Sequence, residues 1–186
     1  MSLPEFPRLV RLLLALTLAG LTAGCFQPLY GDPSGTMGGA GVRDKMSAVS
    51  VEPVVTSGGG GRLPRVGGEV RNELIYQLTG GGEANTTSYR LFINMGASNY
   101  QLIVDPGTNR SDVQNYGIDA SYRLVEVGTG RQVASGSTFS RVSFDTPGQE
   151  QRFAGLRGLR DAENRAAKVI AENIKSRLAS YFTAGT

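Results

Sequence analysis

Residues Tyr116–Leu124, YGIDASYRL, carry the clearest secondary-structure pattern of the chain. Every second side chain is apolar, and the side chains between them are Gly117, Asp119, Ser121 and Arg123. Because successive side chains of a β-strand point to opposite faces of a sheet, this alternation predicts a strand with one buried and one solvated face. Such a contrast is typical of antiparallel sheets that a second layer covers on one side only.

Further strand patterns lie on both sides of this stretch. Apolar and polar residues alternate in Ser88–Asn94 and again in Tyr100–Val104, and Gln132–Phe144 is rich in small polar side chains. A first strand is expected at Met46–Val55, with Pro53 near its end. Turns are expected at Asp105–Gly107 and Val127–Arg131, where residues typical of turns gather.

Two segments show the period of a helix instead. Apolar residues recur every fourth position within Arg62–Leu78, and a longer run with helical spacing extends from Leu156 to Phe182. The order is therefore strand, helix, three or four strands, helix. This order predicts an α+β fold, a two-layer sandwich in which one mostly antiparallel sheet of about four strands carries two helices packed on one face.

The composition excludes much catalytic chemistry. The 186 residues include no histidine and one cysteine, so a Ser-His-Asp triad, a Cys-His pair, a zinc site of His and Cys and an intrachain disulfide are all impossible. The formal charge of +3 comes from scattered Arg and Lys rather than a basic stripe, which argues against nucleic acid as a partner. We expect no catalytic residues, no metal and no cofactor.

Two local patterns resemble functional sites, but we favour a structural interpretation of each. Gly58–Gly61 precedes a helix but lacks the third glycine of a dinucleotide loop and the Gly-Lys-Ser/Thr of a phosphate loop, so a flexible loop fits better. The pairs Glu69/Glu73 and Asp161/Glu163 lie among arginines on patterned helices. A solvated surface explains these carboxylates better than acid–base work or metal binding does.

The N-terminus resembles a secretory signal. Arg8 and Arg11 precede an apolar run from Leu12 to Leu21, which is too short for a membrane span of about 20 residues; a buried helix is the alternative. The only cysteine, Cys25, follows this run. It is a buried apolar group, a reactive thiol or a site of modification.

The polar face of the sheet is the other candidate functional region. Ser135, Ser137 and Thr138 offer small hydroxyls that would let another protein approach closely, although a plain solvated face explains them equally well. Arginine suits bidentate contacts with phosphates or carboxylates. The candidate ligand-binding residues on that side are Arg90, Arg123, Arg131 and Arg141.

Both ends of the chain resemble a known family. Ala23-Gly24-Cys25 is similar to the lipobox of bacterial lipoproteins, and Cys25–Gly31, CFQPLYG, resembles the start of LptE, the lipopolysaccharide-assembly lipoprotein, in its alphaproteobacterial form. The C-terminal helix is similar too, at Phe153–Arg157, Arg160–Ala167 and Arg177–Phe182. The resemblance implies that residues 1–24 are a removed signal peptide, that Cys25 is lipidated, that 25–45 form a flexible tether and that 46–186 form a single α+β domain.

The same resemblance implies a non-catalytic role. Members of the family plug and help assemble the outer-membrane β-barrel LptD and take part in delivering lipopolysaccharide to the outer leaflet, so the expected partners are an LptD-type barrel, lipopolysaccharide and the membrane that holds the lipid anchor. Phe26, rather than aspartate, follows Cys25, which permits sorting to the outer membrane. Two alternatives remain: an auxiliary lipoprotein of another envelope lipid ABC transport system, and a periplasmic enzyme.

Overall fold

The structure is a computed structural model that describes residues 41–58, 60–82, 84, 86–105, 110–145 and 152–184. The chain divides into two compact units, Met1–Gly39 and Ala40–Thr186, and every described residue belongs to the second. Cys25, the expected signal peptide, residues 25–40 of the expected tether and the turn after Asp105 lie outside the described residues.

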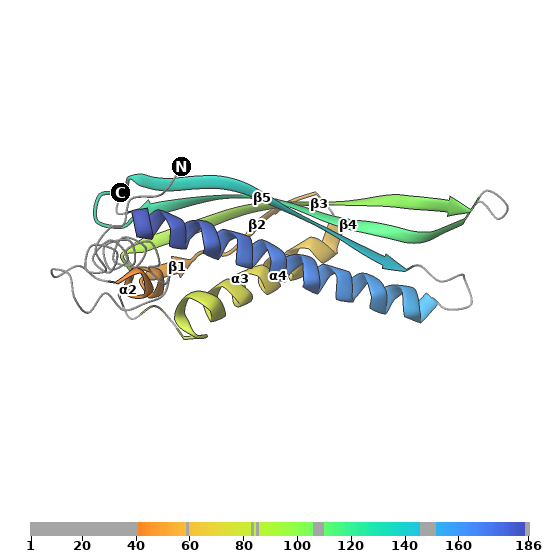
Figure 1. The fold of residues 1–186 in the computed structure, drawn as a ribbon, viewed down its shortest axis with the longest axis horizontal. Helices are drawn as coiled ribbons and strands as arrows, with labels where there is room; N and C mark the ends of the chain where they lie inside the picture. The colour runs from red at the N-terminus through yellow and green to blue at the C-terminus, as the bar shows by residue number, and fades with distance from the viewer. Residues whose placement is uncertain are drawn as a thin grey trace, which may run out of the picture. The chain divides into compact units, whose positions relative to one another are not determined.

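The described unit contains three α-helices and five strands (Figure 1). Their order is α2 (Val42–Ser47), β1 (Val49–Val51), β2 (Val55–Ser57), a short 3-10 turn (Gly60–Arg62), α3 (Leu63–Thr79), β3 (Tyr89–Asp105), β4 (Arg110–Glu126), β5 (Gln132–Asp145) and α4 (Arg152–Ala184). The expected α+β fold class is therefore confirmed, with five strands and three helices in place of about four and two.

One sheet organises the unit. Its strand order is β1-β3-β4-β5, and β2 also pairs with β3. The three long strands are antiparallel neighbours, whereas the short strands β1 and β2 run parallel to β3. In the central register Tyr122 of β4 stands opposite Ile93 of β3 and Gly136 of β5, so these three residues share one face.

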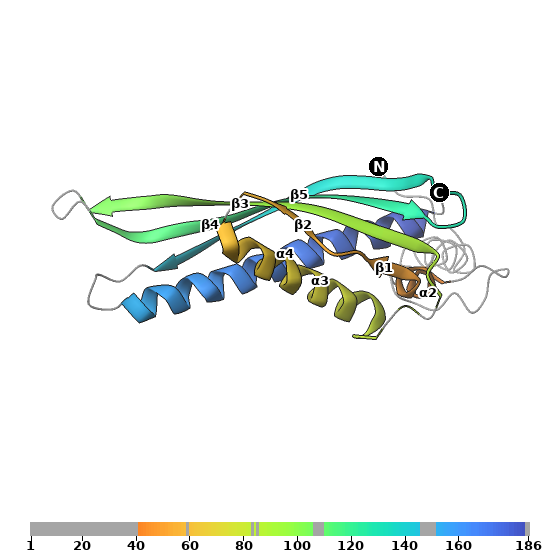
Figure 2. The ribbon, with the colours of Figure 1, turned by 180° about the vertical axis from the view of Figure 1, so that it is seen from behind.

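Both long helices cover the same face of the sheet (Figures 1 and 2). Helix α3 packs on β1, β2 and β3, and α4 packs on β4, β5 and α3. Alternate residues of β4, from Tyr116 to Leu124, are buried beneath them. Ala162, Ala166, Ala167 and Ala171 are fully or almost fully buried, and their small side chains let the backbone of α4 come close to the sheet.

Helix α3 begins and ends at residues suited to those positions. Pro64 lies in its first turn, where the missing N–H is not needed, and Gly80 ends the helix with a positive φ of 77°. The Gly80 N–H donates to the carbonyl of Tyr76 at 2.9 Å, which satisfies one of the last free carbonyls.

Two expected strand boundaries are wrong. Met46 and Ser47 end helix α2, and the expected first strand is two short ones separated by Glu52–Val54. Pro53 lies in that gap because it has no N–H to donate to a ladder. The strands expected at 88–94 and 100–104 are one strand, β3, because β4 pairs with it through the intervening residues, as in Asn99 opposite Tyr116.

Candidate functional site

The face of the sheet opposite the helices is the candidate site. Cross-strand pairing places side chains on this outer face in rows, because paired residues point the same way. From β3 through β4 to β5, the rows are Phe92–Arg123–Ser135, Asn94–Ser121–Ser137 and Gly96–Asp119–Phe139. The middle row thus consists of small polar side chains only.

Arginines flank the small polar row and are held against the sheet. The Cζ atom of Arg123 lies 4.6 Å from the ring centre of Phe92, and that of Arg141 lies 5.5 Å from the ring centre of Phe139. A guanidinium over an aromatic face is attracted by the π electrons while its edge stays available to water or a ligand. Arg141 also donates from Nη2 to Asp119 Oδ1 at 2.8 Å.

A shallow hollow of about 400 Å³ lies on this face. Asn94, Ser121 and Ser137 line it together with Phe139, whose side chain is 65% exposed. Hydrogen-bonding groups beside an exposed aromatic ring are typical of surfaces that recognise other molecules. The hollow can therefore bind a protruding group.

The structure places most of the predicted site residues on the outer face. Ser135 and Ser137 are exposed there, and so are Arg123, Arg141 and Arg90. Arg90 Nε lies 3.7 Å from Glu52 Oε1. Arg131 differs, because it lies at the turn between β4 and β5, where its carbonyl accepts from the Glu126 N–H at 3.0 Å.

Thr138 is not on the outer face, and the expectation that it joins Ser135 and Ser137 is wrong. Successive side chains of a strand point to opposite faces, so Thr138 points away from the face of Ser137 and toward the helices. It is 7% exposed. Its hydroxyl accepts a hydrogen bond from Asn173 Nδ2 of α4 at 3.0 Å. Thr138 therefore links the two layers.

Sequence reasoning missed the two aromatic residues of the outer face. Phe92 and Phe139 look like core residues by type, but their positions in β3 and β5 match those of Asn94 and Ser137. The signal was available in the strand period, because residues two apart share a face. An aromatic residue in phase with exposed polar ones is expected on the outer face rather than in the core.

The outer face presents hydrogen-bonding and aromatic side chains, which suit a contact surface. No group of three or more His, Cys, Asp or Glu gathers within the described part of the chain in a way that could hold a metal ion. On the outer face the carboxylate of Asp119 is paired with Arg141. Of the helices that the structure describes, none combines the length and the apolar character that crossing a membrane requires.

Comparisons with known proteins agree with this fold. Residues 46–178 match the model of the LptE family, described as lipopolysaccharide-assembly. A protein of Caulobacter crescentus CB15 assigned as a lipoprotein superposes with a TM-score of 0.58 at 22% identity, over 79% of this chain and 98% of that one. Rare lipoprotein B from Shewanella oneidensis gives 0.50 at 13% identity, over 73% and 98%. The curated proteins contain no significant match.

Proposed function

The chain belongs to the LptE family of lipopolysaccharide-assembly proteins, and from this premise we propose that it is a non-catalytic lipoprotein of the outer membrane. In this proposal it docks inside an LptD-type β-barrel, helps that barrel assemble and takes part in delivering lipopolysaccharide to the outer leaflet. A lipid anchor on Cys25 holds the folded unit at the membrane.

The outer face of the sheet carries the proposal. None of the helices that the structure describes covers it, and its central row, Asn94–Ser121–Ser137, is small and polar. The interior of an outer-membrane barrel is polar as well, so this face could exchange its hydrogen bonds with water for hydrogen bonds with the barrel wall. Short side chains also let the two backbones approach closely.

The anchor supports the same location. Each buried CH₂ of an acyl chain contributes about 0.8 kcal/mol, so the two or three chains of a bacterial lipoprotein give durable attachment. In this proposal, Cys25 attaches the chain to the membrane ahead of the unit that begins at Ala40.

Photocrosslinking in intact cells tests the docking. A photoreactive residue is placed at Ser121 or Ser137 on the outer face, and at Glu172 on the exposed side of α4 for comparison. We expect the outer-face positions to give an adduct with a large outer-membrane β-barrel. An adduct with an inner-membrane ABC complex would favour a role in another envelope lipid transporter. Absence of a barrel adduct from every outer-face position would refute the docking.

A further inference from the structure

A groove separates the edge strand β1 from helix α3. Strand β1 lies at one edge of the sheet and packs beside α3 (Figure 2). The groove between them has a volume of about 430 Å³. One wall is Val49–Val51 of β1, and the loop after α3 adds Gly81 and Gly82. The other wall consists of Arg71, Ile75 and Thr79, which are spaced four residues apart and so share one side of α3.

The backbone of β1 directs hydrogen-bonding groups into this groove. The Ala48 carbonyl accepts from the Tyr89 N–H at 3.2 Å, and the Glu52 N–H donates to the Leu91 carbonyl at 3.0 Å, so these positions face β3. Backbone groups of alternate residues point the other way, which turns those of Val49 and Val51 toward α3. The Val49 carbonyl and the Val51 N–H have no partner among the described residues.

Arg71 marks one end of the groove. Its Nε donates to the Val51 carbonyl at 3.0 Å, which leaves the two Nη groups of the guanidinium as donors. At the other end, Thr79 Oγ1 lies 2.8 Å from the Ile75 carbonyl oxygen and 2.5 Å from that of Gly82. These contacts hold the loop after α3 against the end of the helix. The groove therefore has two fixed walls and a charged end.

The charge at that end has no counterpart among the described residues. Arg71 is the only ionisable residue among those that line the groove in the described part of the chain, and it forms no ion pair there. The carboxylates closest to the groove residues in sequence are engaged elsewhere. Glu52 faces Arg90 at 3.7 Å, and Glu73 accepts from Gln77 Nε2 at 2.8 Å. A carboxylate from outside would complete the guanidinium of Arg71.

We propose that this groove binds the free C-terminal end of an extended peptide. The peptide adds to the edge of β1, where one of its residues donates its N–H to the Val49 carbonyl and accepts at its carbonyl from the Val51 N–H. One residue bonding to both positions is the pattern of a parallel pair, so the peptide runs in the direction of β1. Its end then lies beside Arg71, whose Nη groups donate to the terminal carboxylate.

The length of β1 limits what is recognised. Three strand residues span about 10 Å, so the last two or three residues of the peptide lie in the groove. This inference goes beyond the proposed function and does not depend on it.

Fluorescence anisotropy with the full chain in neutral detergent micelles tests the site. The probes are fluorescein-labelled hexapeptides whose last three residues are drawn from Ala, Ser, Thr and Val, because a small groove suits small side chains. We expect at least one to bind saturably. The C-terminal amide of the same sequence should bind about ten-fold more weakly, the effect of losing one charge-assisted contact. Arg71→Gln should weaken binding of the acid by a similar factor, and amidation should then cost little more.

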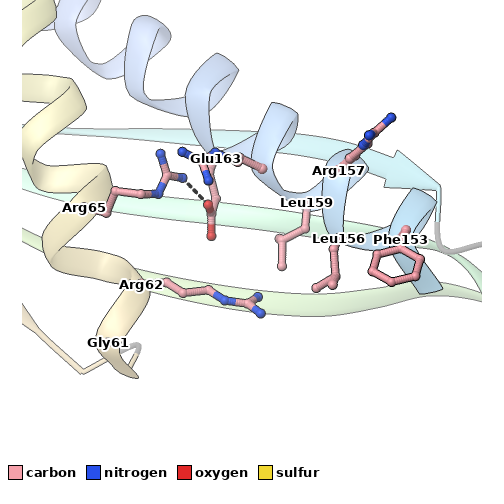
Figure 3. A pocket seen from close by; sticks show the side chains of 9 residues that line it. Gly61, Arg62, Arg65, Phe153, Leu156, Arg157, Leu159 and Glu163 are labelled. Carbon is pink, nitrogen blue, oxygen red and sulfur yellow. Dashed lines mark hydrogen bonds and ion pairs between the residues drawn. The ribbon is translucent and has the colours of Figure 1, made fainter.

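Matched variants test the groove without touching Arg71. Gly82→Trp places a large side chain in the groove, at a position where the space around an added Cβ is open, and should weaken binding. Gly128→Trp, at an equally open position outside the groove, should bind like the parent. Arg62→Gln should also bind like the parent, because Arg62 is exposed at the beginning of α3 and lines a different pocket (Figure 3).

Several results would overturn the inference. They are the absence of saturable binding by any of the peptides, equal binding of acid and amide, and an equal effect of amidation in the parent and in Arg71→Gln. Full displacement of the peptide by millimolar acetate would also overturn it, because it would indicate a site for small anions. Barrel crosslinking from Ser137 is a separate measurement. A chain that binds the peptide but crosslinks to no barrel would refute the proposed function and still support this site.

Discussion

Gly136 of β5 lies directly opposite Tyr122 of the neighbouring strand β4. The packing of the Tyr122 ring requires that residue 136 have no side chain. A Cβ atom added at Gly136 would lie 2.8 Å from the Tyr122 hydroxyl oxygen and 3.0 Å from Cζ of the same ring. Because Tyr122 is 7% exposed, its ring has little room to move. We expect Gly136→Ala to lower the free energy of unfolding by about 1–3 kcal/mol in urea titration.

Two further variants check this explanation. Gly128→Ala should change stability by less than about 0.5 kcal/mol, because the space around Gly128 is open. Adding Tyr122→Phe to Gly136→Ala should restore part of the loss, since it removes the nearest atom. A Gly136→Ala protein as stable as the parent would contradict the packing argument.

Tyr116 makes stability depend on alkaline pH. Burial, and next the charge of Glu163, raises the pKa of Tyr116 from 10.0 to about 12, although Arg65 and Arg62 act in the opposite direction. A pKa that is higher in the folded state stabilises the fold fully below pH 10, and this contribution is lost as the pH rises through 12. We therefore expect the free energy of unfolding to fall between pH 10 and pH 12.

Urea titrations at a series of pH values measure this effect. Tyr116→Phe should flatten the decline, whereas Tyr76→Phe should not, because Tyr76 is 67% exposed. If the two variants declined alike, Tyr116 would not be the group responsible.

At the scale of elements, a hydrogen bond between two side chains joins α4 to β5. Thr138 and Asn173 form it within a partly buried layer. Thr138→Val keeps the shape but leaves the Asn173 amide without its acceptor, so we expect a loss of about 1–2 kcal/mol. Ser137→Ala, one residue away on the exposed face, should cost less than about 0.5 kcal/mol. Equal thermal or urea midpoints for the two variants would show that the bond contributes nothing.

The sequence predicted elements best where one period continues without interruption. The alternation of Tyr116–Leu124 and the helical spacing of Leu156–Phe182 both lie within real elements, β4 and α4. The period continues through Met95 and Ala97 but breaks at Asn99, where a polar residue takes the next apolar position, so β3 looked like two strands. Its continuity comes from pairing with β4, which is a tertiary effect that local pattern does not contain.

At the scale of the whole molecule, the outer face and the contact between α3 and α4 differ in how far a sequence can reveal them. Strand parity alone places Ser135 and Ser137 on one face and Thr138 on the other. The contact between Arg65 and Glu163 could not be predicted, because these residues are 98 positions apart and only the packing of α3 on α4 brings them together. The same packing decides which arginines pair with a carboxylate, and the sequence does not indicate which ones do.

Docking of the outer face leads to a prediction about association. Ser137→Trp places a large side chain in the central row of small residues, where it would hold a barrel wall away. We expect co-purification of the barrel to fall about ten-fold, equivalent to roughly 1.4 kcal/mol, while the unfolding midpoint stays unchanged. Ser180→Trp, at an exposed position of α4, is the matched control and should retain the partner. Full retention of the barrel by Ser137→Trp would exclude this row from the interface.

In the proposed function, attachment to the membrane depends on one sulfur atom. Because Cys25 is the only cysteine, Cys25→Ala leaves no thiol for a diacylglyceryl group, and the leader should remain uncut. We expect the variant to lose palmitate labelling and to be absent from the outer-membrane fraction. Its measured mass should still include residues 1–24. Thr22→Leu is the matched control, since it brings the sequence closer to the lipobox and should preserve all three properties. A native chain with an unmodified thiol would contradict the anchor.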